Sequence, residues 1–313
     1  MSNDIAGIVD NKALLVIGSN TSEAHPVIAL RMREAVKRGA KLIVADPRHI
    51  GLVDDAALWL RHRPGTDAAL INGLCHVIIR DNLADQAFIN ERTEGYEVMA
   101  RAVAECTPDR TESITGVPAA DIEAAARIYA EAERAGIYYT MGITQHTSGT
   151  NNVLALANLA LLTGNMGKPG AGLNPLRGQN NVQGASDMGA NPLNMPGYQR
   201  VDNEEARVRI GEIWGHLPKT EPGLTATEMT PAMLDGRIAA MWIMGENPVL
   251  SDPNASHVRE AFAKLDFLLV QDIFLTETAE LADVVLPAAS FAEKDGTFTN
   301  TERRVQRVRR AVR

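Results

Sequence analysis

The chain has 313 residues, 45% of them hydrophobic and 22% charged, and its 31 basic and 39 acidic side chains leave a formal charge of −8. This composition is typical of globular proteins and excludes disordered, collagen-like and membrane-embedded classes. A net acidic chain lacks the basic face that neutralises phosphates, so we expect no nucleic-acid partner. The length predicts two domains.

The elements follow one another as alternating strands and helices, which favours parallel sheets covered by helices. In chain order the pattern predicts strand 13–17, helix 26–37, strand 41–45, helices 68–82 and 119–132, strand 137–141, helix 151–163, a helix ending near 214, strand 239–244, helix 257–264, and strands 267–270 and 284–286. We therefore expect an α/β protein of two domains with mostly parallel, doubly wound (Rossmann-like) sheets flanked by helices. The first domain is predicted at 1–178 and the second, incomplete, at 179–313.

Two stretches lack a hydrophobic period. Residues 169–196 are dominated by Gly, Asn, Gln and Pro, and a long irregular segment of this kind is usually functional or disordered. Asp202 and Glu205 are predicted to form a capping box for the helix that follows. A polar connector is then expected to reach Pro231.

The two cysteines, Cys75 and Cys106, are too few for a disulfide framework or for an iron–sulfur cluster, which typically needs about four thiolates. The N-terminus shows no secretory signal, and the longest apolar run, 153–162, is much shorter than the ~20 residues that cross a bilayer. We expect no membrane span and a cytoplasmic location.

A near-repeat points to nucleotide binding. Gly-Ser-Asn at 18–20 follows the first strand and Gly-Glu-Asn at 245–247 follows a later one; 28 residues separate Gly18 from Asp46, and 27 separate Gly245 from Asp272. In a nucleotide-binding βαβ unit the glycine permits a tight turn, and the acid after the second strand reaches ribose hydroxyls or a base. His-Pro-Val at 25–27 is matched with Asn-Pro-Val at 247–249. Two such units imply two nucleotides or one double-sized cofactor.

Other interpretations of the repeat stay open. Neither loop has the full G-x-G-x-x-G spacing, which disfavours a conventional NAD site. Gly-x-Asn is also a simple turn, and an aspartate also simply ends a strand. Asp67, after Gly-Thr at 65–66, is predicted to be the N-cap of a helix whose backbone N–H groups could face an anion.

The irregular segment contains one charged residue between 169 and 186, Arg177. A guanidinium without a partner in its own segment is suited to binding a small carboxylate through two parallel hydrogen bonds. Alternatively, Arg177 ties the loop to backbone carbonyls. The amides of Gln179, Asn180 and Gln183 suit either a heterocycle or neighbouring backbone.

These motifs carry a family resemblance. Leu-Thr-Gly-Asn-Met-Gly at 162–167, Arg-Gly-Gln-Asn-Asn-Val-Gln-Gly at 177–184, Asp-Pro-Arg at 46–48 and Gly-Glu-Asn-Pro at 245–248 closely resemble the catalytic alpha subunit of molybdenum- or tungsten-dependent formate dehydrogenases. The resemblance covers essentially the whole chain.

The resemblance implies a metal held by two molybdopterin guanine dinucleotides, one on each α/β domain, which meet in a shared cleft. One dinucleotide would be seated by Gly18, Asn20, Asp46, Arg48 and Asp67, and the other by Gly245, Asn247, Gln271 and Asp272. Gly142 and Gly178 are further cofactor-binding residues by the same resemblance. Arg177 matches the arginine that orients formate, with Gln179 and His146 nearby. No residue of this chain is assigned as a metal ligand.

Three features of that family are missing from this sequence: an N-terminal domain with a four-cysteine 4Fe-4S cluster, a cysteine or selenocysteine followed by histidine, and a C-terminal domain. Cys75-His76 imitates the metal-binding pair but lies within an apolar helical period, which predicts a core position. We expect an internal fragment, inactive alone, whose substrate is formate and whose electrons pass to a cluster and an electron-transfer subunit. The alternatives are a truncated, non-catalytic cofactor-binding or assembly module, or another member of the cofactor family such as a nitrate reductase.

Overall fold

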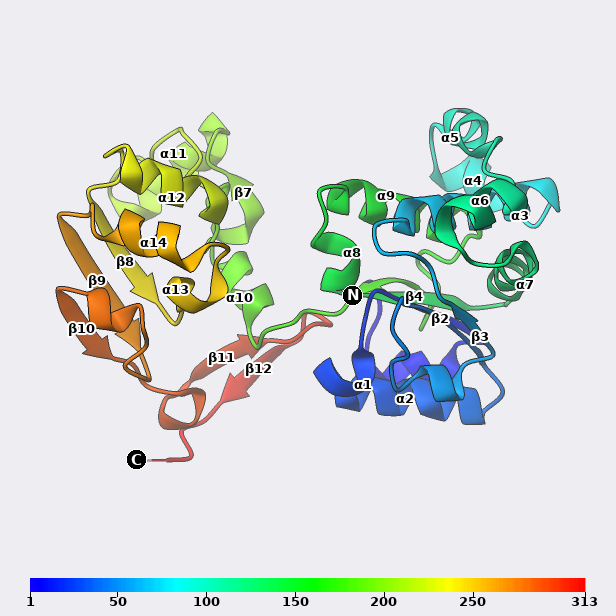
Figure 1. The fold of residues 1–313 in the computed structure, drawn as a ribbon, viewed down its shortest axis with the longest axis horizontal. Helices are drawn as coiled ribbons and strands as arrows, with labels where there is room; N and C mark the ends of the chain where they lie inside the picture. The colour runs from blue at the N-terminus through cyan, green and yellow to red at the C-terminus, as the bar shows by residue number, and fades with distance from the viewer. Residues whose placement is uncertain (313) are drawn as a thin grey trace. The chain divides into compact units, whose positions relative to one another are not determined.

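The computed structural model describes residues 1–312, which fold into two compact units (Figure 1). Unit 1 comprises residues 1–180 and 301–304, and unit 2 comprises residues 181–300 and the C-terminal residues from 305. The chain therefore changes unit after residue 180, two residues beyond the expected boundary. It also returns briefly to unit 1, which local sequence patterns do not reveal.

Unit 1 is built on a five-stranded, wholly parallel sheet in the order β3-β2-β1-β4-β5. The strands are β1 (Ala13–Ile17), β2 (Lys41–Ala45), β3 (Leu58–Leu60), β4 (Ala135–Tyr139) and β5 (Gly172–Pro175). From β1 the chain adds β2 and β3 on one side and then crosses to add β4 and β5 on the other. This is the doubly wound arrangement, and it confirms the predicted fold class.

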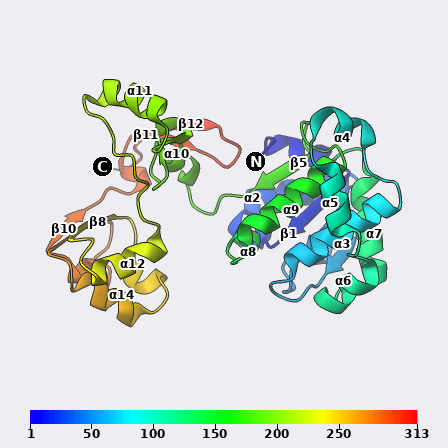
Figure 2. The ribbon, with the colours of Figure 1, turned by 90° about the horizontal axis from the view of Figure 1, so that it is seen from above.

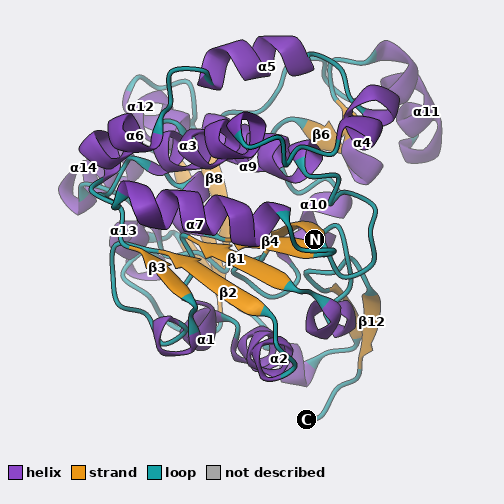
Figure 3. Ribbon diagram, turned by 90° about the vertical axis from the view of Figure 1, so that its right-hand side faces the viewer, coloured by secondary structure: helices purple, strands orange, loops and turns teal. Residues whose placement is uncertain are grey.

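Helices cover both faces of this sheet (Figure 3). Leu14 and Val16 of β1 pack with α2, whereas Leu15 and Ile17 pack with α3, α7 and α9 on the other face. The helical segments of unit 1 are η1 (Ala6–Asp10), α1 (Thr21–Ala24), α2 (Pro26–Lys37), η2 (Val53–Asp55), α3 (Asp67–Arg80), α4 (Gln86–Arg92), α5 (Tyr96–Val103), α6 (Pro108–Thr115), α7 (Ala119–Ala130), α8 (Met141–Thr144) and α9 (Gly149–Leu162).

Local sequence explains the bounds of the first βαβ unit. All five residues of β1 are buried, as expected for a continuous apolar run in a parallel sheet. Pro26 lies in the first turn of α2, where its missing N–H costs nothing, and Gly39 follows the helix with a φ of +98°. The predicted elements 13–17, 26–37 and 41–45 are confirmed with the same bounds.

Unit 2 contains a three-stranded parallel sheet in the order β10-β9-β8, with α12 and α14 packed together beside it (Figure 2). Its sheet strands are β8 (Ala240–Met244), β9 (Phe267–Asp272) and β10 (Val284–Pro287). Two antiparallel pairs accompany them, β6 (Asn194–Met195) with β7 (Gln199–Arg200) and β11 (Gly296–Thr299) with β12 (Val305–Val308). The helical segments are α10 (Val182–Asp187), η3 (Pro196–Tyr198), α11 (Glu204–Trp214), α12 (Ala226–Leu234), α13 (Pro248–Ser251), α14 (Ala255–Phe262), η4 (Ala279–Leu281) and η5 (Phe291–Glu293).

Several local predictions are wrong. The segment 169–196 is not wholly irregular, because it contains β5, α10 and β6. The connector does not extend to Pro231, since α12 begins at Ala226 and includes that proline. The predicted strand 137–141 is β4 at 135–139, because Thr140 turns away and Met141 begins α8.

The predicted capping box of α11 is also wrong. Asn203 is the N-cap, and its side chain accepts a hydrogen bond from the N–H of Ala206 at 2.9 Å. Asp202 instead pairs with Arg200 at 2.6 Å. Asp and Asn are both common N-cap residues. Here the carboxylate of Asp202 is bound to Arg200, and the helix is capped by Asn203. Finally, none of the helices in residues 1–312 combines the length and apolarity needed to cross a membrane.

Candidate functional site

The loops that leave the carboxyl ends of the unit 1 strands bring the predicted residues to one edge of the sheet. Gly18 follows β1, Asp46 follows β2, Thr140 follows β4 and Arg177 comes shortly after β5. The order of strands reverses between β1 and β4. In open α/β sheets ligands bind at this reversal, outside the carboxyl ends of the strands.

Two glycines let the loops after β1 and β4 touch. Gly18 has a φ of +57°, and its carbonyl oxygen accepts hydrogen bonds from the N–H of Gly142 at 3.1 Å and from Oγ1 of Thr140 at 2.7 Å. A Cβ on Gly142 would lie 2.5 Å from that oxygen, and a Cβ on Gly18 would lie 2.7 Å from the Gly142 carbonyl carbon. Only glycine fits at either position, and bare backbone is left where the two loops meet.

A cleft of about 380 Å³ opens beside this crossing. It is lined by seven residues predicted from the sequence: Gly18, Asn20, Asp46, Arg48, Asp67, Gly142 and His146. Loops that are far apart along the chain thus converge as the resemblance implies. The cleft also has lining residues that the sequence reasoning missed, namely His62, Pro64, Gly65, Thr140 and Met141.

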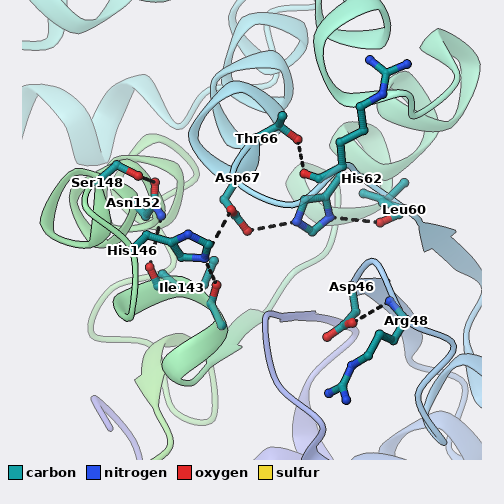
Figure 4. Close-up of polar contacts among 12 residues, drawn as sticks. Asp46, Arg48, Leu60, His62, Thr66, Asp67, Ile143, His146, Ser148 and Asn152 are labelled. Carbon is teal, nitrogen blue, oxygen red and sulfur yellow. Dashed lines mark hydrogen bonds and ion pairs between the residues drawn. The ribbon is translucent and has the colours of Figure 1, made fainter. Parts of the chain in front are cut away.

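Asp67 is the buried centre of a histidine pair in this cleft (Figure 4). Nε2 of His62 donates to Oδ1 of Asp67 at 2.9 Å, and Nδ1 of His62 lies 3.3 Å from the carbonyl oxygen of Leu60. Nε2 of His146 lies 3.9 Å from Oδ2 of Asp67 and donates to the carbonyl of Gly142 at 2.8 Å. The carboxylate therefore faces imidazoles from two different loops.

Electrostatics keep Asp67 ionised. Burial alone raises the pKa of Asp67, but the hydrogen bond from His62 and the charges of His62 and His146 outweigh it, so the net pKa is lowered below its ordinary value. The side chains of Asp67 and His62 are both almost completely buried. Truncating one partner would leave a buried charge uncompensated.

This arrangement corrects the predicted role of Asp67 as an N-cap. Thr66 is the N-cap of α3, Asp67 is its first residue, and no side chain caps the helix. The carboxylate turns toward His62 instead. The signal that could have found His62 is its position in the polar segment 61–66 between β3 and α3, which holds two arginines and is followed by Asp67.

Asp46 and Arg48 form a turn at the end of β2 (Figure 4). Oδ1 of the buried Asp46 accepts a hydrogen bond from the N–H of Arg48 at 2.8 Å, and its carbonyl accepts from Nε1 of Trp59 at 2.9 Å. The guanidinium of Arg48 is exposed and forms no ion pair within residues 1–312. The turn thus presents a carboxylate and a free cation side by side at the cleft.

The loop between β1 and α2 holds several buried polar atoms without partners. Oδ1 of Asn20, Oγ of Ser22 and Nδ1 of His25 are buried and bond to no atom of residues 1–312. Buried polar atoms in native proteins are almost always hydrogen-bonded. Of these residues only Asn20 lines the cleft, so its unpartnered Oδ1 marks a place where a polar ligand would complete the hydrogen bonding.

The backbone of Arg177 is fixed while its side chain is free. Its N–H donates to Oγ1 of Thr301 at 3.1 Å, and its carbonyl accepts from Nε2 of His25 at 2.7 Å. Within residues 1–312 the exposed guanidinium forms neither a hydrogen bond nor an ion pair, so it does not tie the loop to carbonyls. The sequence alternative in which Arg177 is a structural tether is wrong for its side chain.

The neighbours of Arg177 divide into two kinds. Gly178, Gln179 and Asn180 are exposed, and the side chains of Gln179 and Asn180 have no hydrogen-bond partner within the described part of the chain. Gln183 is buried, and its Nε2 donates to Oδ1 of Asp187 at 2.8 Å and to the hydroxyl of Tyr198 at 2.9 Å. Gln183 therefore stabilises unit 2 and is not available to a ligand.

Unit 2 repeats the backbone of the first loop. Gly245 has a φ of +66° and its N–H donates to the carbonyl of Gln271 at 2.9 Å; the N–H of Gly18 donates to Ala45 in the same way at 3.1 Å. The carbonyls of Asn20 and Asn247 both accept from the first turn of the short helix that follows. Oδ1 of Asp272 accepts from the N–H of Phe274 at 3.2 Å, as Asp46 does from Arg48. The near-repeat in the sequence is thus a repeat in structure.

Two details of the repeat differ from expectation. His25 precedes α2, whereas Asn247 precedes α13, the counterpart of α1; the matching of 25–27 with 247–249 is therefore wrong. Asn247 also differs from Asn20 in its side chain. Its Oδ1 accepts from Oγ1 of Thr278 at 2.7 Å, and its Nδ2 donates to Oε2 of Glu277 at 2.8 Å.

The described residues, 1–312, include no cluster of side chains that could hold a metal ion. Within residues 1–312 no three His, Cys, Asp or Glu side chains are grouped to hold an ion. Cys75 lies in the core of unit 1, as its helical period predicts, and burial raises the pKa of its thiol to about 12. A thiol with such a pKa is protonated at neutral pH and is a poor metal ligand.

Comparison with known proteins identifies the family. The model of the molybdopterin oxidoreductase family matches residues 1–313, so the chain belongs to that family. A solved structure, acetylene hydratase from Pelobacter acetylenicus, superposes with a TM-score of 0.75 at 23% identity, covering 98% of this chain and 47% of that one. At this identity the likeness concerns the fold.

Curated relatives with much higher sequence identity are named as formate dehydrogenases or their subunits. The F420-dependent formate dehydrogenase subunit alpha of Methanocaldococcus jannaschii is 53% identical over 312 residues, which is 100% of this chain and 46% of the relative. Formate dehydrogenase H of Escherichia coli is 45% identical over 314 residues, 100% of this chain and 44% of the relative. The chain spans a little under half the length of these relatives.

Proposed function

We propose that this chain is the central part of a formate dehydrogenase catalytic subunit, which oxidises formate to carbon dioxide, one proton and two electrons. The observation that carries the proposal is the similarity at 45–53% identity, over the whole chain, to alpha subunits named as formate dehydrogenases. The cleft at the strand reversal of unit 1 supports it, because seven of the residues that the resemblance implies line one cavity, although Arg177 is not among them.

The residues present fit a molybdopterin guanine dinucleotide. In unit 1 the buried Oδ1 of Asn20 has no hydrogen-bond partner and can accept a hydrogen bond from the cofactor. The carboxylate of Asp46 can bind a ribose or a base, and the guanidinium of Arg48 can bind a phosphate. The bare backbone at Gly18 and Gly142 permits close approach. In unit 2 Gly245, Asn247, Gln271 and Asp272 repeat this backbone arrangement, which supports a second copy of the dinucleotide.

When bound, the cofactor supplies the molybdenum or tungsten centre that accepts the two electrons of formate oxidation. The work of the chain is to seat it and to orient the substrate. Arg177 binds the formate carboxylate through its free guanidinium, on a loop whose backbone is held by His25 and Thr301. Gln179 and Gly178 lie beside it on the same loop.

One wall of the cleft contains Asp67, His62 and His146, and the carboxylate of Asp67 interacts with both imidazoles. Asp67 holds His62 by a direct hydrogen bond and faces His146, whose Nε2 is fixed on the Gly142 carbonyl. These contacts fix the imidazole of His146 at the crossing of the two loops. The metal ligand, the 4Fe-4S cluster and the electron-transfer partner belong, in this proposal, to polypeptide outside residues 1–313.

The role of Arg177 is tested in the full-length enzyme with Arg177→Ala. We expect formate turnover to fall at least a hundredfold, about 2.7 kcal/mol of transition-state stabilisation, while metal and pterin content per subunit stay unchanged. Arg101→Ala is the matched control, because Arg101 is also exposed and lies on α5, away from the cleft. Loss of cofactor in Arg177→Ala would assign the loop to scaffolding.

Seating of the cofactor is tested separately with Asn20→Ala. Its Oδ1 has no partner and its side chain caps no helix, so removal should leave the unfolding temperature of the cofactor-free protein unchanged or slightly raised. Pterin bound per subunit, measured by fluorescence after oxidative release, should fall. Unchanged pterin content in both Asn20→Ala and Asp46→Ala would contradict the assignment of this cleft.

A further inference from the structure

Helix α1 connects the cleft of unit 1 to the loop of Arg177. The helix is one turn long, and Asn20 before it and Ala24 at its end both line the cleft. The next residue, His25, lies outside the cleft lining, and Nε2 of its ring donates to the carbonyl of Arg177 at 2.7 Å. A single helical turn therefore separates a residue assigned to the cofactor from the residue that holds the arginine assigned to formate.

The backbone of His25 is fixed from both sides. Its N–H donates to the carbonyl of Thr21 at 2.9 Å, and its carbonyl accepts from the N–H of Ala29 at 3.0 Å. Pro26 restricts it further, because the helical region is disfavoured for a residue that precedes proline. Its φ is −140°. The imidazole thus projects from a rigid corner between α1 and α2.

The imidazole of His25 has one hydrogen-bond partner among residues 1–312, the carbonyl of Arg177. A carbonyl oxygen can only accept, so Nε2 carries the proton and Nδ1 of the neutral ring carries none. Nδ1 is buried and has no partner in the same residues. The bond to Arg177 is therefore the polar contact that orients the ring.

Side chains from distant segments hold the backbone on both sides of Arg177. Oγ1 of Thr301, 124 residues away, accepts from the N–H of Arg177 at 3.1 Å and donates to the carbonyl of Pro175 at 3.2 Å. His25, 152 residues away, holds the carbonyl of Arg177. The residues that follow, 178–180, are exposed. The fixed part of the loop thus ends at the residue whose guanidinium is free.

We propose that His25 is a positioning residue for the substrate, because its hydrogen bond to the Arg177 carbonyl fixes the point from which the guanidinium reaches formate. The inference rests on the proposed function, in which Arg177 binds the formate carboxylate. A shift of the Arg177 backbone carries the guanidinium with it, and a misplacement of about 1 Å can cost about a hundredfold in rate. Through α1, His25 also keeps Arg177 in register with the residues that line the cleft.

A purely structural role for the same hydrogen bond predicts a different result. Its loss would then lower the fraction of folded, cofactor-loaded enzyme and leave the KM for formate unchanged. In a positioning role the loss weakens the binding of formate by Arg177. It therefore raises KM without lowering the pterin content per subunit.

The test compares His25→Gln with His25→Asn in the full-length enzyme. The amide nitrogen of Gln takes the place of Nε2 and can donate to Arg177, whereas the shorter Asn amide takes the place of Nδ1 and does not reach it. With rates expressed per bound pterin, we expect the KM for formate to rise at least about tenfold in His25→Asn and less than about threefold in His25→Gln. Equal KM values in the two variants overturn the proposal.

His76→Gln is the matched control. Nδ1 of His76 donates to the carbonyl of Val103 at 3.0 Å, in unit 1 but outside the cleft lining, and the longer Gln side chain does not restore that bond. The control therefore removes a comparable hydrogen bond from a histidine, and its KM for formate should equal that of wild type.

A double-mutant cycle identifies the route of the effect. In the Arg177→Ala background, His25→Asn should change the KM for formate by less than about twofold, since the residue that it positions is gone. The full effect in that background overturns the proposal. Wild-type turnover in Arg177→Ala would instead contradict the role of Arg177 in the proposed function. Impaired turnover in Arg177→Ala beside a normal KM in His25→Asn refutes this inference alone.

Hydrogen exchange gives a measurement that needs no turnover. In the full-length subunit the amide of Arg177 should exchange faster in His25→Asn than in His25→Gln, measured by mass spectrometry on peptides that contain residues 175–178. Equal exchange in the two variants shows that His25 does not hold the loop and overturns the proposal. Loss of folded, pterin-loaded subunit in both variants assigns His25 a structural role and also overturns it.

Discussion

The crossing of the loops after β1 and β4 makes a quantitative prediction, because the repeat provides its own control. Gly18 and Gly245 occupy equivalent turns with φ of +57° and +66°. A Cβ at residue 18 would lie 2.7 Å from the carbonyl carbon of Gly142 and 2.9 Å from the backbone nitrogen of Ile143, whereas a Cβ at residue 245 would have no atom within 4 Å. Alanine is therefore strained by conformation at both positions and by contact at only one.

The magnitudes follow from these two terms. The left-handed conformation costs an alanine about 1–2 kcal/mol at either site. Forcing the Gly142 backbone away from the new Cβ of residue 18 adds about 1–3 kcal/mol. We expect Gly18→Ala to destabilise unit 1 by about 2–5 kcal/mol and Gly245→Ala to destabilise unit 2 by about 1–2 kcal/mol. Gly142→Ala isolates the contact, because its Cβ would lie 2.5 Å from the Gly18 oxygen while residue 142 has no positive φ.

The assay is native-state hydrogen exchange, because a protein of two units need not unfold in one step. The amides of Leu15 and Ile137 report on unit 1, and that of Val270 reports on unit 2. The contact term of 1–3 kcal/mol corresponds to roughly 5- to 150-fold faster exchange, at 1.4 kcal/mol per tenfold. Equal destabilisation by Gly18→Ala and Gly245→Ala would refute the reasoning, since it would mean that the crossing loops separate without cost.

Two further predictions concern charges and caps. Asp67→Ala removes one partner of a buried pair with His62 and should lower the free energy of unfolding of unit 1 by about 3–5 kcal/mol at neutral pH. The native pKa of Asp67 is below its ordinary value of 3.8, so its contribution is present above that pH and is lost as the pH falls through the native pKa. The gap between wild type and Asp67→Ala should therefore narrow below about pH 3.8 in urea unfolding; a constant gap down to pH 3 would contradict the pairing. Asn203→Ala should destabilise α11 by about 1 kcal/mol and Asp202→Ala by much less, because Asn203 alone caps that helix; the reverse order in hydrogen exchange of α11 would restore the capping box.

Local sequence determined the alternation of strands and helices in this protein. The apolar run of β1, the proline that opens α2 and the glycine that follows it are short-range signals, and they gave the bounds of the first βαβ unit without error. The two glycine turns and the aspartates after β2 and β9 were also readable, because a turn needs only its own residues. Residue types and spacing were sufficient to indicate which loops of unit 1 meet at one cleft.

Tertiary structure decided how each side chain is used. Asp67 is a plausible cap in sequence, but the fold brings His62 from the loop after β3 to within 2.9 Å, and a buried ionic hydrogen bond is stronger than a cap. Asn20 and Asn247 look equivalent, yet Thr278 and Glu277 bind only the second, from about 30 residues away. Such contacts depend on pairings between distant segments, and one-dimensional patterns do not contain those distances.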